Sequence, residues 1–274
     1  MAKRSKFVKP EQREIVSAHV LGSKRISPNF VRVTIGGDGL RGFTPMGFDQ
    51  WFRMLIPEAG QSDVRLPHSA GSLWYAQYKL IPKDARPVLR NYTVREFRPA
   101  GGIFGDGPEL DIDFASHGDL GPASAWASSC AAGDPLGLLD EGLIYNPTPD
   151  ARWHLLVGDE SALPAIVGIL RSADPELRVR AYIEIPHADD RQDVTVSENV
   201  EVHWLVRDDA SAKPGELALA TVQAAELPEG PFYTFVAGES DLATGVRRHL
   251  VTDRHVPKSD IAFTGYWRRG RAAY

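Results

Sequence analysis

Cysteine is nearly absent from this chain, with Cys130 the only one among 274 residues. A single cysteine cannot form an intrachain disulfide, and plant-type iron–sulfur clusters take four cysteine ligands. The sequence therefore excludes a disulfide framework and an iron–sulfur cluster held by this chain alone, and it suits a reducing compartment. Histidine, cysteine and carboxylate residues also show no metal-ligand spacing, so we expect no resident metal.

Long hydrophobic runs are missing as well. No uninterrupted apolar stretch approaches the ~20 residues that cross a bilayer, and the basic start at residues 1–6 is not followed by one. We therefore expect a cytoplasmic protein without membrane insertion. The net charge of -5 argues against general nucleic-acid binding. With 43% hydrophobic and 24% charged residues the chain has ordinary globular proportions and is long enough for two domains; we expect a monomer.

The first half of the chain has the rhythm of an antiparallel β-structure. Short runs rich in β-branched and aromatic residues recur between turn clusters, and only the stretch after Pro122 looks helical. The expected strands are residues 15–21, 30–35, 51–56, 89–97, 110–116 and 135–139. This pattern predicts a six-stranded antiparallel β-barrel over residues 1–145.

The second half alternates between strands and helices. Residues 146–150 contain two prolines, which break regular structure and indicate a connector. We expect strands at 153–157, 179–185, 200–206, 232–237 and 261–266, and helices at 162–171, 216–225 and 242–252. Strands that alternate with helices predict a doubly wound, mostly parallel sheet over residues 151–274, which binds ligands at the carboxyl ends of its strands.

The run Arg90–Arg95 has the residue types of a flavin site. Such a site needs an aromatic face for the isoalloxazine ring, a hydroxyl beside its reactive nitrogen and a pocket for the pyrophosphate. Tyr92 and Thr93 supply the first two. Because side chains alternate along a strand, Arg90 and Tyr92 should project to one face and Thr93 to the other. Ordinary sheet surface is the structural alternative for this run by itself.

The pyrophosphate pocket has a candidate at residues 121–124, Gly-Pro-Ala-Ser. A proline just inside a helix start leaves free backbone amides that suit a phosphate. In the second half, Gly158-Asp159-Glu160-Ser161 follows the first expected strand, where a nucleotide would approach. This turn is not a G-x-G-x-x-G fingerprint, and a tight turn with Ser161 as helix N-cap is its structural alternative.

Five motifs occur together and in one order. They are R-x-Y-T-x-R at 90–95, H-G-x-x-G-P-A-S-x-W-A at 117–127, G-D-E-S-A-L-P-A-I at 158–166, A-G-E at 237–239 and G-Y-W-R-R-G at 265–270. In these motifs the chain resembles the siderophore-interacting family of flavoproteins, the FAD-dependent ferric-siderophore reductases related to ferredoxin reductases.

The resemblance implies a relay in which NAD(P)H reduces FAD, and FAD reduces the Fe(III) of a siderophore. Tyr92, Thr93 and Trp267 are the residues expected at the chemistry, with Trp267 shielding the flavin or guiding the nicotinamide. The residues expected to bind the cofactors are Arg90, Tyr92, Thr93, Val94, His117, Gly118, Gly121, Pro122, Ala123, Ser124, Asp159, Glu160, Ser161, Gly238 and Glu239. Arg53, Arg268 and Arg269 are the expected basic residues for an anionic ferric complex.

Several alternatives stay open. His117 could be a turn residue, Arg53 an outward strand residue and Trp267 a core aromatic. Acidic residues after the second expected strand of the parallel sheet favour NADH, whereas Arg191 or Arg207 could pair with the 2′-phosphate of NADPH; the resemblance favours NADPH. A general NAD(P)H-flavin reductase with another acceptor and a non-enzymatic siderophore-binding protein are the rival functions.

Overall fold

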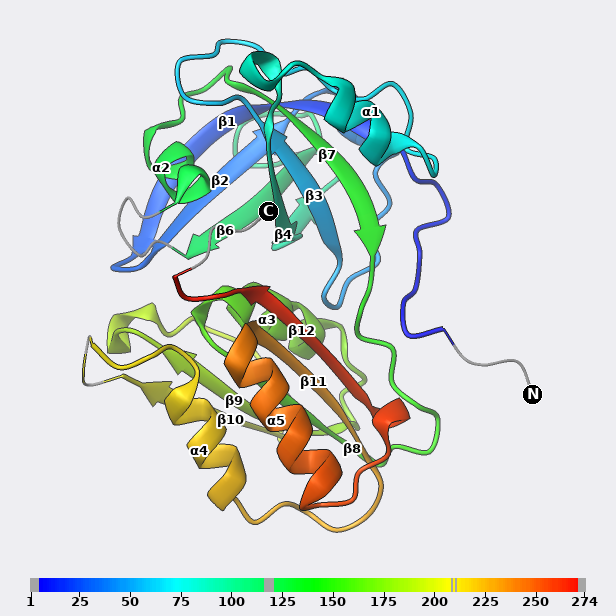
Figure 1. Ribbon diagram of the computed structural model, residues 1–274, viewed down its shortest axis with the longest axis vertical. Helices are drawn as coiled ribbons and strands as arrows, with labels where there is room; N and C mark the ends of the chain where they lie inside the picture. The colour runs from blue at the N-terminus through cyan, green and yellow to red at the C-terminus, as the bar shows by residue number, and fades with distance from the viewer. Residues whose placement is uncertain (1–4, 116–120, 208, 210, 271–274) are drawn as a thin grey trace. The chain divides into compact units, whose positions relative to one another are not determined.

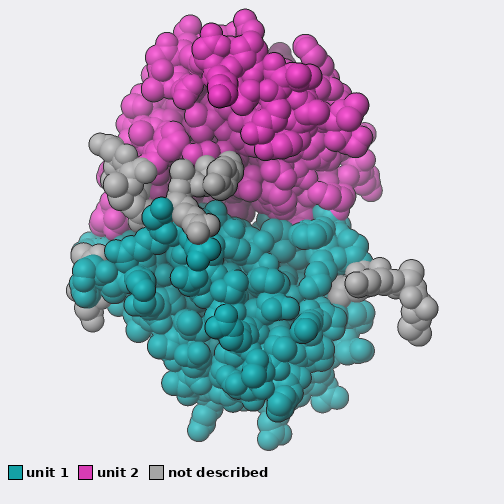
Figure 2. All heavy atoms as spheres, viewed as in Figure 1, with its two compact units in different colours: residues 1–8, 47–49, 144–273 teal, residues 9–46, 50–143, 274 magenta. Residues whose placement is uncertain are grey.

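The computed structural model describes residues 5–115, 121–207, 209 and 211–270. It divides into two compact units, coloured separately in Figure 2. Residues 9–46 and 50–143 form the antiparallel unit, and residues 1–8, 47–49 and 144–273 form the parallel unit. Among the described residues, no helix combines the length and the apolar character that a bilayer crossing requires.

One antiparallel sheet of barrel-like form builds the antiparallel unit (Figure 1). Its strands, in the sheet order β4-β3-β7-β1-β2-β6-β5, are β1 (Ile15–Ser27), β2 (Phe30–Gly36), β3 (Trp51–Ile56), β4 (Val88–Thr93), β5 (Glu96–Arg98), β6 (Glu109–Ala115) and β7 (Pro135–Gly142). The helices are α1 (Trp74–Leu80) and α2 (Pro122–Ser129), with 3-10 turns η1 (Asp38–Gly42) and η2 (Lys83–Ala85).

The predicted count of six strands is wrong by one, because the run 89–97 makes two strands. Val94 donates its backbone N–H to the carbonyl of Gln50 beside β3 (2.8 Å), and Arg95 donates to Asp111 of β6 (2.9 Å). The chain therefore changes partner at these two residues, leaving β4 on β3 and starting β5 on β6. A single-sequence pattern does not reveal this exchange, since both halves favour strand.

Side chains on the two faces of β3 enter different hydrophobic clusters. Phe52 and Met54 point into the main core together with Phe114 and Ile112 of β6. Leu55 lies on the other face, in a smaller cluster under α1. This alternation is the expected consequence of strand geometry, and it fixes which side chains share a face.

The parallel unit is a doubly wound sheet, as predicted. Its strands, in the sheet order β10-β9-β8-β11-β12, are β8 (Trp153–Gly158), β9 (Arg178–Ile185), β10 (Val200–Val206), β11 (Phe232–Glu239) and β12 (Ile261–Trp267), all parallel. The helices are α3 (Leu163–Ser172), α4 (Glu216–Ala224) and α5 (Ser240–Thr252), and the 3-10 turns are η3 (Glu160–Ala162), η4 (Ala188–Asp190) and η5 (Lys258–Asp260).

Helices cover both faces of the parallel sheet. α4 and α5 lie next to each other on one face, where they share a core with Trp153, Leu155 and Val157 of β8. α3 lies on the opposite face (Figure 1). Every residue of β8 is buried, as a central strand between two helical layers requires.

A short segment from early in the chain completes the parallel unit. The amide of Phe48 donates to the Ser172 hydroxyl at the end of α3 (2.8 Å), and the Asp49 carboxylate accepts the amides of Ile144 and Tyr145. A Cβ at Gly168 would lie 2.0 Å from the Phe48 carbonyl oxygen, so only glycine admits the segment. Residues 47–49 therefore group with the parallel unit, although they lie between two stretches of the antiparallel unit in the sequence.

Candidate functional site

The register of β3 on β4 decides which predicted flavin residues share a face. Trp51 is paired with Thr93 and Phe52 with Tyr92. The Tyr92 ring packs against the main core, with its centroid 4.3 Å from that of Phe114. Thr93 is buried on the opposite face, beside Trp51. The predicted division of Tyr92 and Thr93 between two faces is therefore present.

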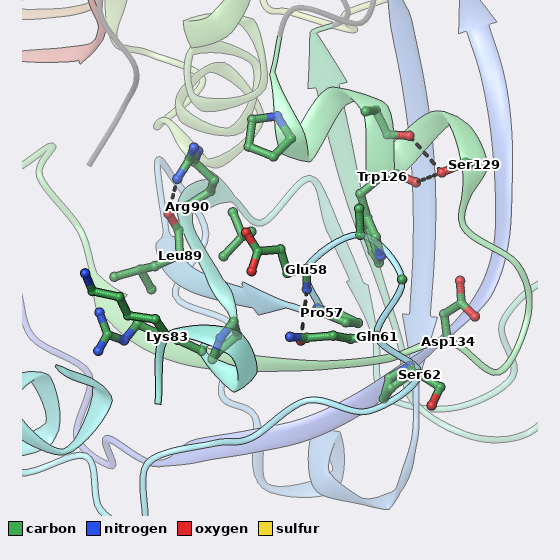
Figure 3. Close-up of a pocket in the computed structure, with 18 of the residues that line it drawn as sticks. Pro57, Glu58, Gln61, Ser62, Lys83, Leu89, Arg90, Trp126, Ser129 and Asp134 are labelled. Atoms are coloured by element: carbon green, nitrogen blue, oxygen red, sulfur yellow. Dashed lines mark hydrogen bonds between the residues drawn. The ribbon is translucent and has the colours of Figure 1, made fainter. Parts of the chain in front are cut away.

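A cavity of about 700 Å³ lies beside Arg90. Figure 3 shows Arg90 of β4, Trp126 of α2 and the loop that follows β3 around this cavity. Its lining includes three cationic side chains, those of Lys83, Arg86 and Arg90. The remaining lining residues are residues 57–62, Tyr78, Pro87, Val88, Leu89, Pro122, Ala125, Trp126, Ser129, Asp134 and Pro135.

The start of α2 lies beside these cations, because Pro122 lines the same cavity. Gly121 is the N-cap residue and Pro122 the first helical residue, and no side chain of the described residues caps the helix. The first intrahelical bond runs from the Ala125 amide to the Gly121 carbonyl (3.0 Å), so the amides of Ala123 and Ser124 have no intrahelical acceptor. Among the residues that the structure describes, a Cβ at Gly121 would meet nothing within 4 Å. This is the geometry of an anion site.

Three other predicted cofactor residues are Val94, His117 and Gly118. Val94 is half-buried and uses its amide to bind Gln50. His117 and Gly118 lie outside the described residues. The aromatic path from Tyr92 through Phe114 continues to Trp126, whose ring centroid is 5.9 Å from that of Phe114.

Arg53 belongs to a cluster of three cations around one buried carboxylate, which we call the cationic cluster (Lys9, Arg13 and Arg53). Each binds Glu141, at 2.8 Å from Lys9, 2.5 Å from Arg13 and 2.6 Å from Arg53. Burial opposes ionisation of Glu141, but these hydrogen bonds hold its pKa below the ordinary value. The cluster therefore keeps an excess of positive charge.

Aromatic rings fix the Arg53 guanidinium from two sides. Its carbon lies 5.4 Å from the ring centroid of Trp51 and 4.9 Å from that of Trp74. Arg53 shares its face of β3 with Trp51 and therefore with Thr93. Arg53 lies two positions after Trp51, about 7 Å along the strand. The sequence indicated Arg53 as a site residue, whereas Lys9 and Arg13 belonged to a basic N-terminal stretch whose expected role was a solvated terminus; the fold brings them to Glu141 from this distant segment.

Predicted residues of the parallel unit meet at the carboxyl ends of its strands. Asp159, after β8, accepts the amide of Glu239 at the end of β11 (2.6 Å) and the indole N–H of Trp267 at the end of β12 (3.2 Å). Asp159 also accepts the amide of Ser161, so it is Asp159 that caps η3. Gly238 has a φ of +133°, which favours glycine. Arg268 and Arg269 follow β12 and are exposed.

The Glu160 carboxylate is paired with an arginine that follows another strand. Arg207, just after β10, donates two hydrogen bonds to Glu160 (both 2.7 Å) and one to Glu184 of β9 (2.8 Å). Both carboxylates are fully buried, and the Arg207 side chain is 7% exposed. Arg207 is therefore committed to two acids, which weakens its candidacy for a 2′-phosphate and leaves the exposed Arg191.

Comparison with known proteins gives the family. Residues 19–143 match the model of the siderophore-interacting FAD-binding domain, and residues 151–270 match that of the siderophore-interacting protein. An uncharacterised protein of Mycobacterium tuberculosis is 33% identical over 270 residues, covering 94% of this chain and 92% of that protein. The chain belongs to the siderophore-interacting protein family.

Two further relatives of this family carry descriptive names. The ferric vibriobactin reductase ViuB of Vibrio cholerae is 32% identical over 253 residues, covering 90% of this chain and 87% of that protein. The crystal structure of a siderophore utilization protein from T. fusca superposes with a TM-score of 0.78 and 29% identity, covering 98% of this chain and 97% of that one. The predicted fold class, an antiparallel barrel-like domain followed by a doubly wound parallel sheet, is thereby confirmed.

The residues of the antiparallel unit fit FAD, the cofactor of this family. The amides of Ala123 and Ser124 at the start of α2, together with the cavity that Arg90 and Pro122 line, suit a diphosphate. A cavity of about 700 Å³ is within the usual range of small-molecule sites and can take part of the cofactor. Trp126, Lys83 and Arg86 line it and were not predicted; Trp126 stands in the predicted 117–127 motif, whereas nothing in the sequence indicates the other two.

Proposed function

We propose that this chain is an FAD-dependent NAD(P)H:ferric-siderophore oxidoreductase, which reduces siderophore-bound Fe(III) to Fe(II) and releases the iron in the cytoplasm. Its membership of the siderophore-interacting family supports this function, as does the ferric reductase named among its relatives. We assign the FAD domain to residues 1–145 and the NAD(P)H domain to residues 151–274, and we expect a monomer.

The observation that carries the proposal is the cavity bounded by Arg90 and the open start of α2. Arg90 supplies charge and residues 121–124 supply backbone amides for the pyrophosphate, while the Trp126 side of the cavity takes the adenosine half. Tyr92, Thr93 and Val94 contact the isoalloxazine ring, with the Thr93 hydroxyl beside its reactive nitrogen. We assign His117 and Gly118 to the same site on the family motif.

The pyridine nucleotide binds at the carboxyl ends of β8 and β11. In a doubly wound sheet this edge is where ligands approach. The 160–161 turn and Gly238 with Glu239 line that edge, and Trp267 lies beside them through its bond to Asp159. Trp267 is our candidate for the ring that shields the flavin or guides the nicotinamide.

The ferric complex is held by charge. Many ferric siderophores are anionic, and the cationic cluster around Glu141 has an excess of two positive charges, since three cations surround one carboxylate. Its Arg53 shares a face with Thr93, about 7 Å along β3 from the residue paired with Thr93. Arg268 and Arg269 add exposed positive charge in the parallel unit.

No protein group needs to act as an obligatory general base. When bound, FAD supplies the conversion of a two-electron hydride into the single electrons that Fe(III) accepts. The protein groups position the reactants: Arg90 and the backbone amides of α2 anchor the cofactor, and the positive charge of the cationic cluster retains the oxidised complex. Siderophores bind Fe(II) far less tightly, so release follows reduction.

A visible spectrum tests cofactor, donor and acceptor together. The purified protein, loaded with FAD, should lose its absorbance near the flavin maximum on anaerobic addition of NADPH or NADH. A ferric siderophore should then restore the oxidised spectrum while a ferrous chelator takes up colour. The two additions made separately distinguish the reduction of the flavin from its reoxidation.

Each rival function has its own outcome in this experiment. A colourless protein that takes up no added FAD would indicate a siderophore-binding protein without enzyme activity. A flavin that is reduced and then reoxidised by free FMN or ferredoxin, but by no ferric siderophore, would indicate a general flavin reductase. Either result contradicts the proposed function.

A further inference from the structure

Asp159 collects hydrogen bonds from three separate segments of the parallel unit. Its Oδ1 accepts the Ser161 amide (2.9 Å) and hydroxyl (2.5 Å). Its Oδ2 accepts the Glu239 amide (2.6 Å) and the Trp267 indole N–H (3.2 Å). An ionised carboxylate offers about four acceptor sites, so these donors occupy its full capacity. Asp159 is fully buried and has no acceptor left for a ribose hydroxyl of a nucleotide.

The neighbouring strand is shaped to admit this carboxylate. A Cβ at Gly238 would lie 2.6 Å from the Asp159 carboxyl carbon and under 3 Å from both of its oxygens. The positive φ of Gly238 independently disfavours any other residue. The glycine of the A-G-E motif therefore serves the approach of Asp159 to β11.

Two further side chains hold the segment that follows β12, residues 267–269, which we call the terminal segment. The Ser240 hydroxyl donates to the Trp267 carbonyl (2.8 Å), and the Glu239 carboxylate accepts the amide of Arg269 (3.2 Å). These contacts fix the backbone of the terminal segment. The indole is held through its N–H, which donates to the Asp159 carboxylate.

We propose that Asp159 is a positioning residue, which orients the indole of Trp267 and ties the terminal segment to the ends of β8 and β11. The consequence for catalysis rests on the proposed function, in which Trp267 meets the nicotinamide or the flavin. Asp159 does not bind the nucleotide; it sets the angle at which the Trp267 ring faces it.

The charge on Asp159 matters, because only the ionised form accepts all four donors. No lysine or arginine side chain of the described residues bonds to it; burial, and then the charge of Glu160, raise its pKa to about 7. The charged groups that face it are Glu160, which Arg207 binds, and Glu239, which accepts the amides of Asp241 and Arg269. A protonated Asp159 would turn an O–H toward one of its donors, and the longest bond, to Trp267, should open first.

Nuclear magnetic resonance of the FAD-loaded protein tests the contact without any turnover. The ¹H–¹⁵N resonance of the Trp267 indole, assigned by its loss in Trp267→Phe, should move in Asp159→Asn and exchange with solvent at least about tenfold faster. Asp253→Asn is the matched control, because Asp253 binds His249 at the far end of α5. An indole resonance that stays in place in Asp159→Asn would overturn the proposal.

A titration of the unmodified protein decides the matter if Asp159→Asn does not fold. The Trp267 indole shift should follow a titration with a midpoint near 7, and a shift that is constant between about pH 5.5 and 8.5 would refute the link. Outside the proposed function these results keep their meaning, since neither needs electron transfer.

Kinetics of flavin reduction then test the role. Asp159→Asn and Trp267→Phe should raise the KM for the pyridine nucleotide by similar factors, and the double variant should add little to either. A defect in Asp159→Asn that Trp267→Phe does not share would show that Asp159 acts by another route. If the unmodified protein reduces no flavin with either nucleotide, the proposed function fails while the positioning by Asp159 can still hold.

Discussion

Arg207 lies between two buried carboxylates of the parallel unit, and replacing it would remove the cation that they share. Its guanidinium makes three hydrogen bonds of 2.7 to 2.8 Å to Glu160 and Glu184, both fully buried. Arg207→Met keeps an apolar side chain of similar length and removes the cation. Two carboxylates then stay in the interior without their partner.

The expected cost is that of breaking a buried ion pair, about 3–5 kcal/mol. Glu184 retains two donors, the amides of Gly215 and Ala218, which should moderate the loss at that carboxylate.

Urea unfolding followed by tryptophan fluorescence measures this cost. Arg180→Met is the matched control, because Arg180 pairs with the half-exposed Glu201 at 2.8 Å in the same sheet and should lose at most about 1 kcal/mol. Adding Glu160→Gln to Arg207→Met should restore part of the loss, through a coupling energy of about 1–3 kcal/mol. A deficit for Arg207→Met no larger than the control would refute the reasoning.

The same variant tests nucleotide recognition. Because the Arg207 donors are engaged by Glu160 and Glu184, the variant should change the KM for NADH and for NADPH by the same factor. A loss of more than about tenfold for NADPH alone would mean that Arg207 leaves its acids to bind the 2′-phosphate.

Four other substitutions address cofactor, substrate and pH. Arg90→Ala should weaken FAD binding by about 10–100-fold in a fluorescence titration, the loss of a charged hydrogen bond, with little effect on FMN, whose single phosphate lacks the pyrophosphate; equal losses would contradict its role. Arg53→Ala or Arg269→Ala should lower affinity for an anionic ferric complex by about tenfold and reduce its salt dependence, while flavin reduction by NAD(P)H stays near normal; equal loss of both steps would refute separate roles. Burial lowers the pKa of His154 to about 4, below its unfolded value, so the unfolded chain takes up the proton first as pH falls and stability drops. From pH 7 to pH 5 the wild type should therefore lose about 2 kcal/mol relative to His154→Phe in urea unfolding, and a constant difference would show that His154 titrates normally.

Local pattern was sufficient for most of the fold. The strands and helices of the parallel unit agree with the predicted ranges to within a few residues, because a period of 2 and a period of 3.6 are properties of short stretches. The short helix α1 was not predicted, since residues 74–80 have neither a capping residue nor a clear polar face. The division of 89–97 into β4 and β5 depends on partners far away in the chain.

For the site, the sequence by itself determined which functional groups are available. These are the R-x-Y-T run, the glycine and proline at the start of α2, and the acidic residues after β8. Tertiary structure decided how these residues are used. Strand register put Arg53 on the face of Thr93, a distant segment brought Lys9 and Arg13 to Glu141, and two buried acids took Arg207. The sequence presented Asp159 as a candidate cofactor ligand, whereas in the structure its carboxylate accepts four hydrogen bonds from three segments. Residue types and local periodicity can be read from short stretches of sequence. The partner of a buried charge cannot, because it depends on which strand ends the fold brings together.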